Sequence, residues 1–596
     1  MITPMTRYSF ILVNGEQEGF LSSLQQLGLV DITRSIKPVD EGSALLMGRA
    51  EKLQGLIQRL EALELPAEGQ SLAVESPLPE AAQTLLERHE GLQEAVKAAD
   101  KDIAARRSWG SFSMERLREL EQLGCKVHFH VSSSKAFQKE WADQAALSVI
   151  SEEGGVVRYV VVGEDPLPDE VSAPEDDVRE AEARKTELLQ EDALVLSQLR
   201  SIKERLPLLK EEKAAALSEL DLALAGAAAS PAAENTIVTL EGYCPTESEE
   251  AVSTFLDKTD VFYLKEEAHA EQNPPISLRN NRFVRMFEVL TDMYGRPAYD
   301  GFDPTPFLSI FFLLFFAMCM GDAGYGLVLI LVGLGLKKVD SFKGLAPLVT
   351  TLGIGTFVIG FWFHTFFSVD ISKWAIFEGM QGLFLPEHLF GLEYDAAMVL
   401  SLIVGVVHIC LALIVKTVIA TKNNGFVGSL GTWGWTLLIV GGVIVAAASL
   451  AGVMDAGITR VVVIALGIVS ALGIFLFNDI RRNPLLNIGS GLWDTYNTAT
   501  GLLGDVLSYL RLYALGLAGA MLGYAFNDLG KMILGDGGIT QWIGFIAVVV
   551  IGHALNIAMC ALGAFVHPLR LNFLEFFKNA GYEGAGRPFN PLQKQQ

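Results

Sequence analysis

A single arginine inside an otherwise apolar segment raises the first chemical question about this chain. The stretch from Gly501 to Phe526 exceeds the roughly 20 residues that cross a bilayer, and Arg511 lies near its middle. Arginine keeps its proton, and placing it in a membrane helix costs at least about 2.5–3.5 kcal/mol. Because a lipid-facing or packing role needs no such residue, the cost predicts a functional partner of opposite charge.

Small residues share the predicted helix face of Arg511 and make that side thin, so that another helix can pass close to it. They are Gly504, Ser508, Ala514, Ala518 and Gly519. A permanent cation on a shallow face suits a carboxylate that moves past it.

The last apolar segment carries a polar stripe with steps of three and four residues, which follows one face of a helix. Its members are His553, Asn556, Cys560, Gly563, His567 and Arg570. Such a stripe predicts an ion or proton path. Alone, Arg570 is equally typical of a residue that snorkels to the membrane boundary. Together with Arg511 and the stripe, it indicates function.

The remaining titratable and sulfur-containing residues add little chemistry. His408 lies in another apolar segment, where a lone histidine is more often a packing residue than a proton relay. The five cysteines show no CxxC spacing, so neither a disulfide framework nor a zinc site is indicated. We expect no metal and no cofactor. Gly321–Gly326 predicts a tight turn between two spans, and no Gly-Lys-Ser/Thr follows that would make it a phosphate loop.

The elements that position these residues divide the chain into two halves. Up to about residue 300 the chain is charged and helix-forming, and its acidic residues account for most of the net charge of −23, which argues against a nucleic-acid partner. Beyond it, apolar runs predict about eight transmembrane helices. They lie near residues 306–320, 323–336, 345–368, 396–420, 428–453, 458–478, 497–526 and 541–567.

Basic residues predict the orientation of these spans. With the amino terminus inside, the inner loops and the tail carry Lys337, Lys338, Lys343, Lys416, Lys422, Arg481, Arg482, Lys578, Arg587 and Lys594. The outer connections carry only Lys373, Arg460 and Lys531. This asymmetry obeys the positive-inside tendency and places both termini in the cytoplasm. The start of the chain does not read as a signal peptide.

The first half mixes strand-like and helical patterns. Strand-like runs occur at Tyr8–Val13, Ala44–Met47, Lys126–Val131, Val156–Val162, Ile237–Leu240 and Val261–Leu264. Two long segments show the alternating three- and four-residue spacing of a coiled coil, from Leu85 to Ile103 and from Val178 to Leu220, and Pro207 predicts a kink in the second. A mere spacer is as compatible with this pattern as a functional stalk.

The sequence therefore predicts a mainly α polytopic membrane protein, with a cytoplasmic α/β dumbbell on an antiparallel coiled-coil hairpin before the spans. The expected parts are a proximal α/β lobe at 1–78 (completed by 231–300), a coiled-coil helix at 79–110, a distal α/β lobe at 111–172, a returning coiled-coil helix at 173–230 and a transmembrane domain at 301–596.

Three stretches resemble the subunit a family of V-type ATPases, called subunit I in bacterial and archaeal complexes. They are Asn280–Arg285 with Thr291–Gly295 and Asp303–Phe307; Gly321–Gly326; and Ser508-Tyr-Leu-Arg-Leu-Tyr-Ala-Leu515, supported by His567-Pro-Leu-Arg-Leu571 and, weakly, by Leu240–Pro245. The resemblance implies that Arg511 matches the family's essential arginine and Arg570 the second one. Gly519 and Cys560 stand where eukaryotic members usually have His and Glu, so proton-path details do not carry over there.

This resemblance implies a non-catalytic stator subunit of a rotary ATPase that translocates H⁺ or Na⁺, with ATP chemistry on other subunits. The implied partners are a proteolipid ring, peripheral stalk subunits, the catalytic head through those stalks, and the lipid bilayer. The implied location is a prokaryotic inner (plasma) membrane. Half-channel candidates by type and spacing are Asp505, Ser508, His553, Asn556, His567 and Glu575. The alternatives are a secondary transporter, which leaves the coiled coil unexplained, and a membrane scaffold, which leaves Arg511 unexplained.

Overall fold

The computed structural model describes two compact units of the chain. The long-helix unit comprises Leu12–Gly28, Ile32–Leu240 and Leu592–Gln596, and the apolar-helix unit comprises Met1–Ile11, Leu29–Asp31 and Glu241–Pro591. The structure describes residues 1–595 except for 14, 36, 66–76, 111–113, 135, 138–145, 164–168, 172–177, 233–235, 260, 340–341, 375, 377–378, 380–381, 383, 387, 390–392, 477–483 and 536–537. Arg481, Arg482 and parts of the predicted distal lobe therefore lie outside the described residues.

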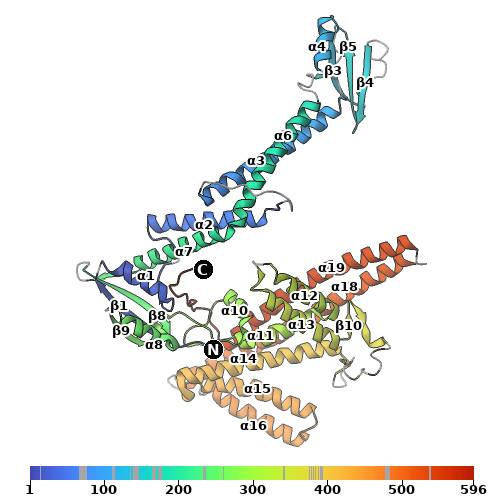
Figure 1. The fold of residues 1–596 in the computed structure, drawn as a ribbon. Helices are drawn as coiled ribbons and strands as arrows, with labels where there is room; N and C mark the ends of the chain where they lie inside the picture. Colours follow the sequence, from blue (N-terminus) through green and yellow to red (C-terminus); the bar gives the residue numbers. More distant parts are fainter. Residues whose placement is uncertain are drawn as a thin grey trace. The chain divides into compact units, whose positions relative to one another are not determined.

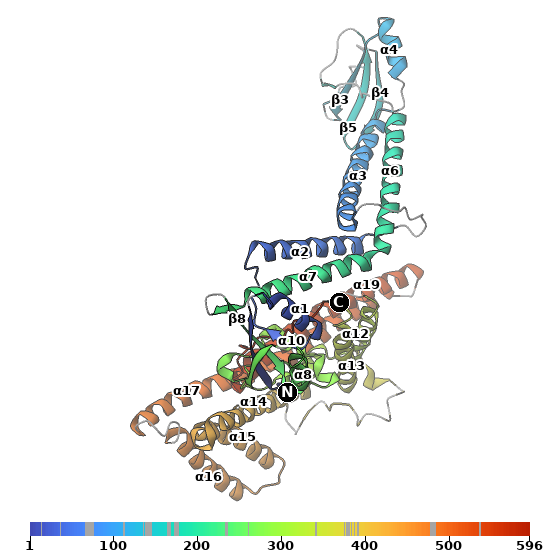
Figure 2. The ribbon, with the colours of Figure 1, turned by 60° about the vertical axis from the view of Figure 1, so that its left-hand side comes forward.

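The long-helix unit is built on two successive helix pairs (Figures 1 and 2). Helix α3 (Leu78–Arg107) packs on α6 (Val178–Glu204), and α2 (Glu41–Ala62) packs on α7 (Leu206–Ala227). All four contribute to one apolar cluster, in which Leu60, Ala82, Leu199, Ile202 and Leu209 are fully buried. The long antiparallel pairing expected from the heptad spacing is present, but the returning helix changes partner halfway.

That change occurs at the interruption that Pro207 predicts. The returning helix stops at Glu204 and resumes at Leu206, with the proline in the first turn of α7. A proline there lacks only an N–H that would be unpaired in any case. The predicted kink is therefore confirmed, and it separates the part that packs on α3 from the part that packs on α2.

The strand expected at Ala44–Met47 is wrong, because these residues lie in the second turn of α2. Asp40 caps the helix, its carboxylate accepting a hydrogen bond from the backbone N–H of Ser43 at 2.7 Å, and Ser43 completes a capping box. Short apolar runs do not distinguish strand from helix by period alone. The cap upstream decides the outcome here.

Two sheets account for the other strand-like runs. A distal antiparallel sheet has the order β4-β5-β3-β6, formed by β3 (Val127–Ser133), β4 (Ala146–Glu153), β5 (Val156–Val162) and β6 (Glu170–Val171). It lies beside α4 (Met114–Gln122), and its core is Val157, Tyr159 and Val161.

The second sheet joins the start of the chain to the end of the returning segment. Its order is β2-β8-β1-β9, with β1 (Met5–Val13), β2 (Asp31–Ile32), β8 (Ile237–Pro245) and β9 (Phe262–Glu267); β7 (Ser230–Ala232) pairs with β8. Its helical neighbours in the chain are α1 (Gln17–Leu27) and α8 (Glu249–Leu256). The strands expected at Tyr8–Val13, Ile237–Leu240 and Val261–Leu264 are confirmed, with ends that differ by up to five residues because β8 continues to Pro245.

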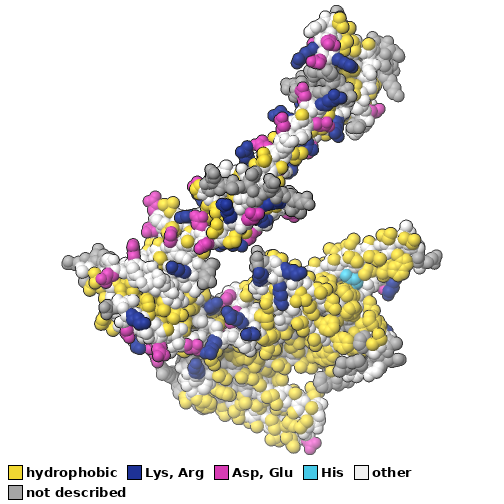
Figure 3. All heavy atoms as spheres, viewed as in Figure 1, with side chains coloured by type: hydrophobic (Ala, Val, Ile, Leu, Met, Phe, Trp, Pro, Cys, Tyr) yellow, Lys and Arg dark blue, Asp and Glu magenta, His cyan; other side chains and the backbone are white. Residues whose placement is uncertain are grey.

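The apolar-helix unit contains five described helices long and apolar enough to cross a membrane: Ala396–Gly428, Leu430–Leu450, Ala456–Phe475, Asn487–Leu534 and Ile539–Ala580. Three shorter apolar helices precede them, α11 (Thr305–Met320), α12 (Ala323–Leu336) and α13 (Ala346–Trp362). The predicted apolar runs are thus helical, while the count of spans stays a prediction. Figure 3 shows hydrophobic side chains gathered over this unit.

The element bounds refine these segments. The 396–428 helix is α14, bent at Gly425, and it is followed by α15 (Leu430–Leu450), α16 (Ala456–Phe475), α17 (Pro484–Ser508), α18 (Leu510–Leu534), α19 (Ile539–Arg570), a π-helical segment (Leu571–Phe576) and α20 (Phe577–Ala580). Short helices α9 (Arg282–Arg285) and α10 (Glu288–Tyr294) lead into α11, and β10 (Thr365–Phe366) pairs with β11 (Val369–Asp370) after α13.

The predicted Gly321–Gly326 turn is only partly correct. Gly321 ends α11 with a φ of 54°, and Asp322 caps α12, so the turn spans these two residues and the rest is helical. Gly324 and Gly326 instead permit close contact, since a Cβ on Gly326 would overlap the backbone of Phe357 in α13. A glycine spacing that suits a turn also suits a helix interface.

Candidate functional site

Helices α17, α18 and α19 carry most of the predicted site residues. An interruption of one residue, Tyr509, separates α17 from α18 and places Arg511 in the first turn of α18. Glycines let α18 and α19 approach closely, because a Cβ on Gly519 would lie 2.6 Å from the sulfur of Cys560 and one on Gly552 would overlap the ring of Phe526.

The thin face beside Arg511 stays a prediction, and the exposure of its residues varies. Gly504, Ala514 and Ala518 are exposed, and Ser508 is partly exposed. Gly519 is an exception: it is buried and faces α19. Residues three or four positions apart do not lie exactly above one another on a helix. Gly519 lies at the edge of the predicted face and there contacts α19.

Positive charge gathers where α18 meets the end of α19. Arg511 and Arg570 both act electrostatically on His567. The Nη1 atom of Arg511 is buried and has no hydrogen-bond partner, and neither arginine forms an ion pair among the residues that the structure describes. Arg570 is exposed at the end of α19. The charge of Arg570 acts on the Glu575 carboxylate without forming an ion pair, so Arg511 is the cation of this site with no carboxylate partner among the described residues.

A second group, of acidic and amide side chains, lies on the α17 side of Arg511. The Nδ2 atom of Asn579 donates to Asp505 at 2.8 Å, and Lys578 lies 3.9 Å from the same carboxylate. Glu575 interacts with Asp505 and Ser508, is 4 % exposed, and has one carboxylate oxygen without a hydrogen-bond partner among the described residues. A cavity of about 470 Å³ opens beside this group and also reaches Lys416, Asp494, Asn497 and Thr498.

The π-helical segment explains how Glu575 turns inward. Pro568 lies inside α19, and the side chain of Asn572 donates to its carbonyl oxygen at 2.9 Å. A π segment shifts the following residues around the helix axis, and such segments often occur at functional sites. The shift ends the stripe at Arg570 and buries Glu575 against α17, which spacing from a regular helix does not predict.

The first residues of the polar stripe, His553 and Asn556, form a buried hydrogen-bond chain with α12 and α18. Asn556 donates to the Tyr325 hydroxyl at 2.8 Å, and that hydroxyl lies 2.8 Å from Nδ1 of His553. The Nε2 atom of His553 lies 3.0 Å from Oδ1 of Asn527, which favours the Nε2–H tautomer and makes Tyr325 the donor to His553. Asn556 also binds the Gly519 carbonyl and accepts from Cys560 at 3.3 Å.

A tight hairpin closes one end of this chain. Asp322 accepts hydrogen bonds from the backbone N–H groups of Tyr325, Phe367 and Ser368 at 3.1, 2.9 and 2.6 Å. Phe367 and Ser368 have φ values of 47° and 54°, a conformation that non-glycine residues rarely adopt. Asn527 donates to the Phe367 carbonyl at 2.9 Å, so the hairpin is tied to α12 and α18 together.

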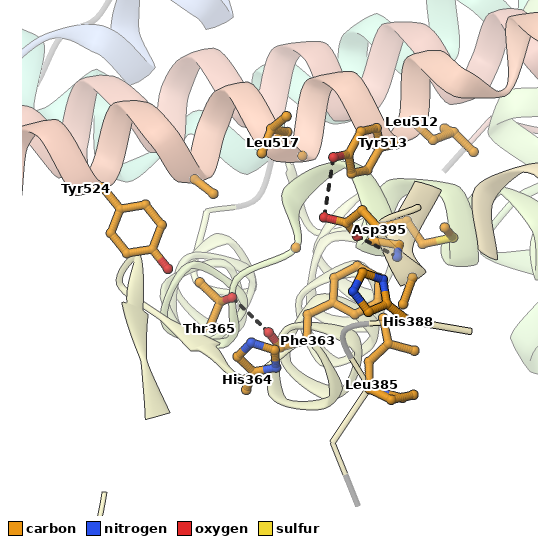
Figure 4. Close-up of a pocket in the computed structure, with 17 residues that line it drawn as sticks. Phe363, His364, Thr365, Leu385, His388, Asp395, Leu512, Tyr513, Leu517 and Tyr524 are labelled. Atoms are coloured by element: carbon orange, nitrogen blue, oxygen red, sulfur yellow. Dashed lines mark hydrogen bonds between the residues drawn. The ribbon is translucent and has the colours of Figure 1, made fainter. Parts of the chain in front are cut away.

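A cavity of about 530 Å³ lies on the other face of α18 (Figure 4). The Tyr513 hydroxyl donates to Asp395, the N-cap of α14, at 3.3 Å. His364, His388 and Tyr524 also line the cavity. Figure 4 shows Asp395 and Tyr513 pointing toward each other across it.

Sequence reasoning missed Tyr325, Asn527, Asp322 and Asp395. The signal for Tyr325 was available: an Asp three residues before it is a helix N-cap pattern, which places Tyr325 on a helix rather than in a loop. The partnership of Asn527 with His553 joins two helices and has no local signature. No group of metal-ligating side chains occurs among the residues searched in the described part of the chain.

Comparison with known proteins finds a family whose profile matches the helices that hold these residues. The profile of the V-type ATPase 116kDa subunit family matches residues 227–341 and 499–594, which include the hairpin-binding Asp322 and both arginines. Over these two segments the chain is similar to the V-type ATPase subunit a/I family. Both segments of this a/I match lie in or next to the apolar-helix unit.

Bacterial members of the a/I family match end to end. The V-type ATP synthase subunit I of Chlamydia pneumoniae is 25% identical over 98% of this chain and 96% of its own length, and subunit I 1 of Treponema pallidum is 26% identical over 100% of both. The A-type ATP synthase subunit I of Methanocaldococcus jannaschii is 30% identical over 59% of this chain, a match that spans about half (54%) of that relative.

A solved cytoplasmic N-terminal domain of subunit I, homolog of subunit a, of V-ATPase aligns over 44% of this chain at 16% identity. Its TM-score of 0.18 carries no argument about the fold.

Proposed function

We propose that this chain is the membrane stator subunit of a rotary V/A-type ATPase. It provides two ion half-channels and the arginine that faces a carboxylate on a proteolipid ring, and it anchors peripheral stalks. Hydrolysis or synthesis of ATP takes place on other subunits. The names of the relatives, all subunit I of V-type or A-type ATP synthases, support this assignment.

The observation that carries the proposal is the pair of unpaired arginines beside an apolar two-helix face. Among the described residues Arg511 has no anionic partner, and Arg570 forms no ion pair, although its charge acts on the Glu575 carboxylate. The surrounding surface of α18 and α19 is apolar and exposed, with Met521, Met559 and Leu562 each more than 60 % accessible. An apolar partner that brings its own carboxylate satisfies both features at once.

The charge of Arg511 makes ion passage productive. A ring carboxylate crosses lipid only when an ion neutralises it, because a bare charge is costly in hydrocarbon. A guanidinium at contact distance favours the charged form of that carboxylate, so the ion is released. A fixed cation between the entry and exit positions then blocks direct leakage from one half-channel to the other.

The two cavities offer separate approaches to this position. One is lined by Asp505 of α17 and lies before Arg511 along the helix, and the other is lined by Tyr513 and Tyr524 of α18 and lies after it. We assign the Asp505 cavity, with Ser508 and Glu575 beside it, to the inner half-channel. We assign the Tyr513 cavity and the buried stripe of His553 and Asn556 to the outer one, and His567 to the gap between them.

The proposed setting follows from the same assignment. The chain resides in a prokaryotic plasma membrane with both termini in the cytoplasm, where the long-helix unit binds the peripheral stalks that lead to the catalytic head. Basic residues of the α12–α13 connection, Lys337, Lys338 and Lys343, and of the second half of α14, Lys416 and Lys422, support that orientation; the last two lie within the helix rather than in the expected loop.

The test is Arg511→Ala in the complete complex, measured as ATP-driven ion uptake into vesicles. We expect assembly in normal amount and loss of at least about 90% of uptake, because no other described cation occupies this position. The matched control is Arg460→Ala, which removes an exposed arginine near the start of α16 and leaves uptake unchanged. Full uptake by Arg511→Ala would remove this residue from the mechanism and the proposal with it.

A further inference from the structure

The backbone immediately before Arg511 is held by a contact that the ion path does not require. Tyr509 interrupts the helix between α17 and α18, and its backbone bonds there are three-residue steps, Tyr509 N–H to Val506 O at 3.2 Å and Leu512 N–H to Tyr509 O at 3.1 Å. The direction in which Arg511 leaves the helix therefore depends on how Tyr509 is seated.

Tyr509 is seated in a slot on α14. Its side chain is fully buried, and a Cβ on Gly405 would overlap its ring, so the glycine is needed for the ring to fit. Phe315 of α11 contacts the same ring edge-on at 5.7 Å between centroids. Two elements other than α17 and α18 thus fix the ring position.

His408, one turn along α14 from Gly405, binds the other end of the tyrosine. Its Nδ1 atom lies 2.9 Å from the Tyr509 hydroxyl. The imidazole is fully buried between two rings, Phe311 of α11 at 4.1 Å and Phe576 at 4.6 Å, the latter nearly parallel at 8°. Its Nε2 atom has no partner among the described residues, so the Tyr509 bond is the one polar contact found there for the ring.

Phe576 connects the His408–Tyr509 contact to the π-helical segment that carries Glu575. It ends the π-helical segment and directly follows Glu575, in the segment that begins after Arg570. One imidazole therefore touches both sides of the site, the α18 start that carries Arg511 and the π segment that carries Glu575. In apolar surroundings such a hydrogen bond is strong and costly to leave unmade.

We propose that His408 and Tyr509 are positioning residues that hold Arg511 in register with the Arg570–Glu575 segment. The inference rests on the proposed function, because it assigns the pair to the orientation of the same arginine. The pair contacts no ion. A misdirected Arg511 lets ions pass without turning the ring, so the expected defect is poor coupling rather than loss of the complex.

The experiment measures ions transported per ATP hydrolysed in the assembled complex. Tyr509→Phe keeps the ring in its slot and removes only the hydroxyl, and His408→Phe keeps an aromatic ring beside Phe576 but removes both ring nitrogens. We expect each to lower the ratio roughly fivefold, the effect of about 1 kcal/mol for one hydrogen bond. The double variant should match either single one, since both remove the same bond. His408→Gln, which can still bond the hydroxyl, should recover part of the ratio.

The control is Ser401→Ala, which removes another fully buried hydroxyl of α14 whose bond runs to its own helix, at Met398 O. It should leave the ratio unchanged. An unchanged ratio in Tyr509→Phe, or a parallel loss of assembly, hydrolysis and transport, would overturn the positioning role. If Arg511→Ala abolishes transport in the same preparation, only the positioning role of His408 and Tyr509 is refuted and the proposed function stands. If Arg511→Ala leaves transport intact, the proposed function itself is refuted.

Discussion

At the scale of single residues, charge in an apolar helix is readable from sequence, whereas its polar partners are not. Arg511 and Arg570 stand out because the free energy of burying them is large whatever surrounds them. Tyr325 and Asn527 carry no such cost, and their roles exist only because α12, α18 and α19 pack together. His408 was expected to be a packing residue, and its stacking between two phenylalanines agrees with that, although it also binds Tyr509.

Two cysteines give a prediction at this scale. Cys244 is fully buried, and burial raises the pKa of its thiol to about 12, whereas Cys125 is exposed. Because the thiolate is the reactive species, a maleimide at pH 7.5 should modify Cys125 within minutes and leave Cys244 unmodified until the protein is denatured. Peptide mass spectrometry measures both sites. Cys125→Ser is the control, and rapid modification of Cys244 in folded protein would contradict the structure.

At the scale of elements, glycine was the hardest residue to interpret. The Gly321–Gly326 pattern fits a turn, and the structure uses only its first two residues that way. Gly326, together with Gly333 further along α12, brings this helix against α13, where Gly326 meets Phe357 and Gly333 meets Thr350. A helix contact of this kind needs a partner far along the chain, so local spacing does not reveal it. The same holds for the π segment, which changes the helix phase before Glu575.

The contact predicts opposite effects for two glycines of one helix. Gly326→Ala adds a methyl group where the backbone of Phe357 lies, and overpacking should cost about 1–3 kcal/mol of stability. Gly335→Ala adds the same group where nothing lies within 4 Å, and should be neutral or gain up to about 1 kcal/mol through helix propensity. Thermal unfolding of the purified protein compares them. Equal midpoints for the two variants would refute close packing of α12 on α13.

At the scale of the whole molecule, the apolar helices could be located from the sequence, because the length and hydropathy of apolar runs are nearly local properties. The change of partner along the returning helix was not predictable: heptad spacing indicates that a helix packs on another, but not on which one. The predicted domain boundaries, the dumbbell shape and the number of spans remain predictions.

Gentle isolation tests the assembly. A tagged copy of this chain, extracted in mild detergent, should bring with it a proteolipid ring, stalk subunits and an ATPase head, identified by mass spectrometry. A variant that lacks residues 41–227 removes both pairs of long helices and should retain the ring while losing the head, if the apolar helices bind the ring unaided. Recovery of the full-length chain without either group of partners would favour a transporter or a scaffold.

The interruption at Arg205 also determines how the long-helix unit responds to force. A continuous helix pair resists bending along its whole length, but this one is spliced where α6 gives way to α7. Flexure concentrates at that joint, and it cannot occur freely, because Leu60, Ile202 and Leu209 from three helices are fully buried around it. Bending must loosen this cluster and is driven back when it repacks. The long-helix unit should therefore bend elastically, and the bending should occur mainly at the joint between α6 and α7.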